Sequence, residues 1–267
     1  MTFDLFVLPF FLGLNALIIM LVVKYTRWIK GFDPADKQLI LKGIWTTKSL
    51  KAGWEVFMES LLHRKMFRRN ALLGYMHMSF AFGWFLLIVC GNLESRIYSK
   101  VHLNPPFYPI FLKYFVHDHR VLAHEMMSIP GAFRVLMDVF LLLVLSGLLL
   151  ALIKRASSNW FGMKKASKHT RLDRIAITAL WLIFPLRWLA ESFTAFTYEG
   201  GSFLTNTTGR LLGSFLPVEH LAYPAWWAYS LALGTFFVCL PFTRFMHIPT
   251  EIMLIFFRHY GVRPPLS

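Results

Sequence analysis

The sequence predicts an all-α integral membrane protein that forms one domain over residues 1–267, with five transmembrane helices. Three observations support this fold class. Hydrophobic residues make up 56% of the chain and charged residues only 16%, whereas soluble domains carry about 25% charged residues. The apolar residues gather in five long segments, and Lys and Arg gather in alternate connections between them. A soluble domain of this size cannot cover so much apolar surface, so we expect membrane lipid to contact it.

The first apolar segment, residues 5–23, is an uncharged run that begins after Asp4 and ends before Lys24, Arg27 and Lys30. A secretory signal has a basic start, a shorter apolar stretch and a cleavage site of small residues. The charges here have the opposite order. We therefore predict a retained transmembrane helix.

The four other predicted spans are residues 71–93, 131–153, 175–198 and 221–242. Each is long enough to cross a hydrocarbon core of about 30 Å as a helix. The connections on one side of these spans contain 21 Lys and Arg residues, and those on the other side contain 5. Because basic loops stay in the cytoplasm, the N-terminus is predicted outside and the C-terminus in the cytoplasm.

Two further segments are predicted to be helices outside the hydrocarbon core. Residues 107–116 follow two prolines and are too short to span, which indicates an interfacial helix. Residues 50–70 form an amphipathic helix on the cytoplasmic side, with apolar residues at helical spacing among basic ones. This helix either lies on anionic lipid or offers a docking face to a cytoplasmic subunit, and the sequence favours neither.

The charge and the cysteines limit the possible partners. The formal net charge of +14 follows from the basic cytoplasmic connections, so we expect no nucleic-acid partner. Cys90 and Cys239 both lie in apolar segments. Two cysteines are too few to hold an iron–sulfur cluster, so any such cluster must belong to a partner subunit.

Two of the ten histidines are candidates for ligands of a haem iron. His77 lies about six residues inside the cytoplasmic end of the second span, roughly 10 Å deep. His247 closes the fifth span at the same leaflet. Two neutral imidazoles from different helices at one depth are what axial ligation of a b haem requires. The alternative is that both are hydrogen-bonded packing residues. The histidines expected in solvent or at the interface are His63, His102, His117, His119, His169 and His259.

The run LPFTRFMHI at residues 240–248 and residues 70–85 around His77 resemble the membrane cytochrome b of respiratory nitrate reductase, its gamma subunit. Related membrane subunits occur in heterodisulfide reductase. The resemblance implies a multi-pass subunit in the inner membrane of a prokaryote. Such a subunit passes electrons between a quinone, menaquinone or ubiquinone, and a cytoplasmic iron–sulfur partner.

The resemblance also implies where haem is held. The family has two haems on four histidines, and its inner pair corresponds to His77 and His247 in this chain. The outer pair corresponds to Leu87 and Tyr229, neither of which is a histidine. Because both members of one pair are replaced together, we predict a single b haem on the inner side, with bulkier side chains filling part of the outer site. His220 is expected at the outer surface as an interfacial residue.

Charged side chains inside the spans are costly and are functional candidates. Arg187 and Glu191 are four residues apart in the fourth span, as are Arg134 and Asp138 in the third. Each is either a self-neutralising structural pair or part of a functional site. In the functional interpretation Glu191 accepts quinol protons and Arg187 holds the quinone oxygen or a haem propionate.

Two more residues complete the predicted sites. His124 is a second candidate proton acceptor, because imidazole titrates near neutral pH. Arg244, three residues before His247, is a candidate for a haem propionate, or else an interfacial arginine that extends towards water.

The sequence thus predicts an electron-transfer subunit of a quinone-linked oxidoreductase, and either direction of electron flow is compatible with it. The main alternative is a haem-free membrane anchor subunit of a larger complex. A transporter is a third possibility, but the sequence contains no internal repeat of the kind that marks many transporters.

Overall fold

The computed structural model describes residues 5–98, 130–160, 170–197 and 201–262. Helices account for 91% of the described residues, which contain no β-strand. Five helices are long and apolar enough to cross a membrane. The predicted all-α fold with five spans is therefore confirmed. The predicted interfacial helix at residues 107–116 and His124 lie outside the described residues.

The five long helices agree with the predicted spans to within a few residues at most ends. They are α1 (Leu8–Lys30), α5 (Ala71–Tyr98), α8 (Pro130–Trp160), α9 (Arg171–Thr197) and α11 (Val218–Cys239). A short 3-10 turn, η1 (Leu5–Val7), precedes α1. Each helix continues past the predicted apolar run at one or both ends where polar residues still have helical propensity.

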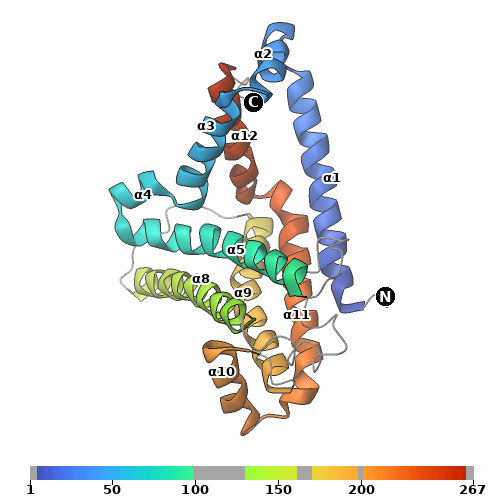
Figure 1. The fold of residues 1–267 in the computed structure, drawn as a ribbon, viewed down its shortest axis with the longest axis vertical. Helices are drawn as coiled ribbons and strands as arrows, with labels where there is room; N and C mark the ends of the chain where they lie inside the picture. The colour runs from blue at the N-terminus through green and yellow to red at the C-terminus, as the bar shows by residue number, and fades with distance from the viewer. Residues whose placement is uncertain (1–4, 99–129, 161–169, 198–200, 263–267) are drawn as a thin grey trace.

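The long helices form two groups. Helix α11 packs against both α1 and α9, and α5 packs against α8. In Figure 1, α5 and α8 run across α1 and α11 rather than alongside them. Small residues bring α5 and α8 close together: a Cβ at Gly83 would lie 2.6 Å from Val144 Cγ2. Because α5 crosses α11, counting residues along each helix does not give the membrane depths of their side chains on one common scale.

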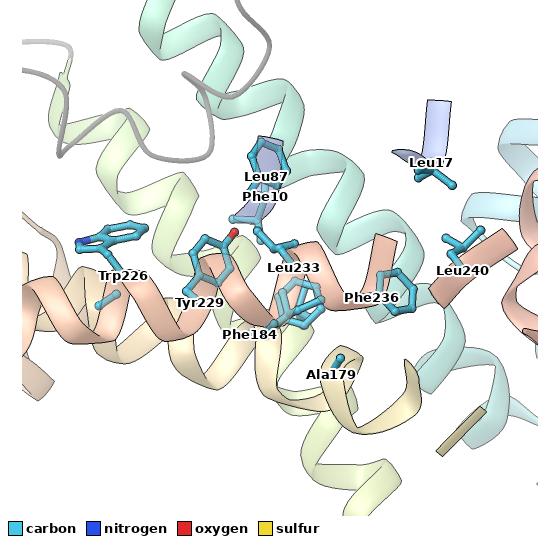
Figure 2. Packing of buried hydrophobic residues seen from close by; sticks show 14 of the residues in the cluster. Phe10, Leu17, Leu87, Ala179, Phe184, Trp226, Tyr229, Leu233, Phe236 and Leu240 are labelled. Atoms are coloured by element: carbon cyan, nitrogen blue, oxygen red, sulfur yellow. The ribbon is translucent and has the colours of Figure 1, made fainter. Parts of the chain in front are cut away.

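Apolar side chains from all five long helices form the main core. Figure 2 shows part of this cluster. Fully buried members include Phe10 of α1, Leu87 of α5, Phe184 of α9, and Trp226, Tyr229 and Leu233 of α11.

The fifth span ends in a broken segment. After Cys239 the chain forms two 3-10 turns, η3 (Leu240–Phe242) and η4 (Arg244–Met246), and then α12 (His247–Tyr260). Pro241 has no backbone N–H to continue a helix, and Thr243 between the two turns is extended, with φ −119° and ψ 175°. His247 is therefore the first residue of a new helix rather than the last residue of the fifth span.

The basic segment after α1 is more divided than expected. It contains α2 (Pro34–Ile44), α3 (Thr47–Val56), a π-helical turn η2 (Phe57–Leu61) and α4 (Arg64–Arg69). The segment predicted as one amphipathic helix at residues 50–70 is thus interrupted. The interruption occurs at His63, whose backbone is left-handed with φ 52°. Helices α2 and α3 both contact α12 (Figure 1).

One shorter helix, α10 (Phe203–Gly213), follows α9. Its N-terminus is capped from another helix, because the Asp138 carboxylate of α8 accepts hydrogen bonds from the backbone N–H groups of Leu204 and Thr205. The partial positive charge of a helix N-terminus stabilises such an anion. The carboxylate predicted to pair with Arg134 is thus bonded to the start of α10.

Candidate functional site

The two histidines predicted as haem ligands come from separate helices and lie near each other. His77 is on α5 and His247 begins α12, and both side chains are exposed. They are close enough for a charge on His247 to act on His77. The break after α11 makes His247 the first residue of α12, whose contacts include the turn η2, and η2 in turn contacts α5.

The hydrogen bond of His247 determines which ring nitrogen can bind a metal. Its Nδ1 lies 2.5 Å from the carbonyl oxygen of Arg244. A carbonyl oxygen only accepts hydrogen bonds, so Nδ1 carries the proton and Nε2 keeps its lone pair. Histidines that bind metals commonly donate the other ring N–H to a backbone carbonyl in this way.

Arg244 is held in place by Asp173 at the start of α9. Its backbone N–H donates to Asp173 Oδ1 at 3.1 Å, and its Nε lies 3.7 Å from Oδ2. Asp173 also accepts hydrogen bonds from the backbone N–H and hydroxyl of Thr170. These contacts fix the turn that precedes His247, while the Arg244 side chain stays 53% exposed.

A third histidine, His63, belongs to the same region. Its ring centroid lies 5.5 Å from that of His77, with 31° between the ring planes. His63 was expected in solvent or at the interface, because it lies in a polar segment. The helical periodicity used there fails at His63, where the left-handed backbone ends one helix and changes the direction of the chain.

Within the described ranges, no group of three or more His, Cys, Asp and Glu side chains is arranged to hold a metal ion.

The two positions at which the sequence resemblance led us to expect a filled outer haem site hold packed side chains. Leu87 and Tyr229 are each 1% exposed and belong to one apolar cluster. Figure 2 shows both among the aromatic and aliphatic side chains of this core. At packing densities typical of protein interiors, such a cluster leaves no room for a macrocycle without rearrangement.

The charged pair predicted in the fourth span is formed inside the protein. Arg187 Nε donates to Glu191 Oε1 at 2.9 Å, and both side chains are almost fully buried. The Arg187 guanidinium also donates to the hydroxyl of Tyr229 on α11. One turn further along, Trp226 Nε1 donates to Thr194 Oγ1 at 3.0 Å. Sequence reasoning found the pair from its spacing but missed Tyr229, because that contact joins two helices.

His220 is exposed in the first turn of α11. Its expected role at the outer interface stays a prediction.

Comparison with known proteins does not assign the chain to a family. No protein-family model matches it, and neither a curated protein nor a solved structure does. The resemblance to the nitrate reductase gamma subunit thus rests on the motifs around His77 and His247 and on the five spans.

Proposed function

We propose that this chain is the membrane cytochrome b subunit of a quinone-linked respiratory oxidoreductase, with one b haem ligated by His77 and His247. The observation that supports the proposal is that these two exposed imidazoles, on different helices, are near enough for the charge of one to act on the other. A haem held by them would supply one-electron transfer between a quinone and a cytoplasmic iron–sulfur partner.

The donor groups suit this cofactor. Neutral imidazole nitrogens are the usual axial ligands of b haems, and the bond from His247 Nδ1 to Arg244 leaves Nε2 as the donor. Arg244 is partly exposed beside this histidine and can reach a propionate while its backbone N–H stays bonded to Asp173. The filled positions at Leu87 and Tyr229 support one haem rather than two.

The excess of Lys and Arg in alternate connections supports a cytoplasmic side for His247, α2 and α3. Glu191 and Arg187 are already paired with each other and with Tyr229. This arrangement favours the structural interpretation of the pair, and a role of Glu191 as quinol proton acceptor requires quinone to reach the pair.

The alternative function is a haem-free anchor subunit. It is favoured by the exposed apolar and basic surface of α2 and α3, where Trp45 is 91% exposed and Leu50 77%. Such a surface is unusual for a chain without a partner or a lipid contact. A chain that folds and assembles without any b-type absorbance would support this alternative.

Substitution of the ligands tests the proposal. In the purified full chain, His77→Ala is expected to lower haem content at least several-fold, and His247→Ala to change either the haem content or the midpoint potential. His220→Ala, which removes an exposed histidine of α11, is the matched control and should leave both unchanged. Unchanged haem content and potential in both ligand variants would contradict the assignment.

A further inference from the structure

The pattern Leu-Lys-x-x-Trp occurs twice in the segment formed by α2 and α3. It covers residues 41–45 and again residues 50–54. In both copies the residue after Lys is small and faces inward: Ala52 is fully buried, and a Cβ at Gly43 would overlap the Tyr260 ring of α12. The Leu and Trp side chains of both copies face outward, with exposed fractions between 64% and 91%. Two helices thus turn the same kinds of side chain away from the protein.

Helical spacing places the outward side chains of each copy on one face. In α3, Leu50 and Trp54 are four residues apart, and Lys51 precedes Trp54 by three. Such a face combines aliphatic side chains and indole rings with flexible ammonium groups, as helices that lie at a membrane interface do. Trp is also enriched at the level of the lipid headgroups. The face therefore matches a lipid surface, which has acyl chains below and charged headgroups above.

The exposed charge of α2 and α3 is positive. Lys42, Lys48 and Lys51 are all exposed. Each of the two helices contains one acidic residue: Asp36 is half-buried, and Glu55 is bonded to basic side chains of α12. Clusters of basic residues next to a span are attracted by the anionic lipids of the cytoplasmic leaflet. The charge of this face is thus complementary to anionic headgroups.

The connection from α1 keeps the segment close to the bilayer. Helix α1 belongs to a candidate span that ends at Lys30, and α2 begins at Pro34. A helix that spans a membrane ends near its surface, and four residues of extended chain reach at most about 14 Å. The start of α2 therefore lies within this distance of the end of a span.

A row of aromatic rings links α3 to an exposed side chain of α5. Trp54 stacks on Phe57 with ring centroids 5.6 Å apart, and Phe57 lies edge-on to Phe82 at 5.9 Å. Phe82 in turn stacks with Phe85 at 6.4 Å. Phe85 is 40% exposed on a candidate span, where an apolar side chain faces acyl chains. The row therefore leads from Trp54 to a lipid-facing surface, which favours lipid over a cytoplasmic subunit as the occupant.

We infer that the outward faces of α2 and α3 lie on the bilayer, with Trp45 and Trp54 among the headgroups and Lys42 and Lys51 bound to anionic lipid. This inference goes beyond the proposed function and does not depend on haem.

A spin label on this face tests the inference in the full chain. Thr47 is exposed and shares the outward face of α3, three residues before Leu50 and four before Lys51. Thr47→Cys carries a nitroxide and is reconstituted into phosphatidylcholine bilayers with or without phosphatidylglycerol. Oxygen, which partitions into lipid, should relax the label more than a water-soluble nickel chelate does. Phosphatidylglycerol should raise this ratio about two-fold or more. Cys90 and Cys239 are buried, and the unsubstituted chain gives the background labelling.

Charge variants of the labelled chain test the lysines. Lys42→Gln/Lys51→Gln should abolish the response to phosphatidylglycerol. Arg171→Gln/Arg174→Gln is the matched control, because it removes two exposed basic side chains from α9 and should keep the response.

Three results would overturn the inference. A label that favours the nickel chelate in both bilayers would assign the face to water or to a protein partner. A ratio that favours oxygen but ignores phosphatidylglycerol would contradict binding of anionic headgroups. A response that survives the lysine substitutions would contradict the role of Lys42 and Lys51. Haem quantified in the same samples tests the proposed function separately.

Discussion

The buried pair of Arg187 and Glu191 shows how two charged side chains can be accommodated in the apolar core of this protein. Two charges removed from solvent are tolerated only because each neutralises the other and the Tyr229 hydroxyl accepts a further bond from the guanidinium. Removal of one partner leaves an uncompensated charge in an apolar core.

A mutant cycle separates the structural from the catalytic interpretation of this pair. Glu191→Leu or Arg187→Met alone should lower the free energy of unfolding by about 3–5 kcal/mol, and the double variant should regain most of this loss. Thermal unfolding in detergent measures the effect. A structural pair further predicts that the folded double variant keeps quinone turnover, whereas loss of turnover in that variant would show that Glu191 acts on quinone.

At the residue scale, the sequence predicted contacts between residues that are close together on one helix. Arg187 and Glu191 are four residues apart and form the expected pair. The ligand role of His77 and His247, expected from their depth and surrounding motifs, stays a prediction. The contact of His63 with His77 and that of Arg244 with Asp173 were not predicted. Both join residues that are distant in sequence or separated by a break in periodicity.

At the scale of elements, α1 and α11 are held together by a close approach of their backbones. A Cβ at Gly13 would lie 2.6 Å from Gly234 Cα, and one at Gly234 would lie 2.3 Å from the carbonyl oxygen of Pro9. Small residues at helix interfaces allow this type of packing in membranes.

Gly13→Ala tests the importance of that approach. Alanine gains up to about 1 kcal/mol of helix propensity over glycine, but the overlap at Gly234 should outweigh this, with a net loss of roughly 1–2 kcal/mol. Gly53→Ala is the control, because a Cβ there meets nothing within 4 Å and should stabilise α3. Equal unfolding temperatures for the two variants would show that the α1–α11 contact adapts freely.

The contact between α3 and α12 depends on charge. Glu55 accepts hydrogen bonds from Arg258 at 2.5 Å and from His259 at 2.7 Å. Partial burial acts to raise the pKa of Glu55, but the His259 bond and the positive charges of Arg258 and Lys65 hold it below its ordinary value. The ionised carboxylate therefore stabilises the folded state.

The pH dependence of stability follows from that lowered pKa. The contribution of Glu55 is complete above the ordinary glutamate pKa of about 4.3 and is lost as pH falls below it. Glu55→Gln should lower stability by about 0.5–1 kcal/mol at pH 6, with a difference from the unsubstituted chain that shrinks towards pH 3. Melting curves at both pH values measure this. Glu251→Gln, at an exposed position on α12, is the control, and a constant difference for Glu55→Gln would contradict the linkage.

The elements themselves were largely predictable, because long apolar runs need few assumptions to be recognised as spans. The interruptions between helices were not predicted. The π-helical turn at 57–61 packs against α5, the 3-10 turn η3 packs against α1 and α11, and Arg244 in η4 is bonded to Asp173 of α9. Of these, only Pro241 was visible as a local signal.

At the scale of the whole molecule, the sequence correctly predicted an all-α, multi-pass membrane protein from composition and five apolar runs. It did not predict that α5 and α8 would run across the other spans (Figure 1). Small residues such as Gly83 and Gly147 allow the close contact between α5 and α8. Apolar composition alone does not encode it.

The central claim is that this chain holds one b haem. Its most direct test is a reduced-minus-oxidised spectrum of the purified full chain, combined with haem quantified per chain. We predict b-type absorbance and one haem per chain, since Leu87 and Tyr229 fill the positions of a second. A folded chain without b-type absorbance would contradict the cytochrome assignment, and two haems per chain would contradict the single site.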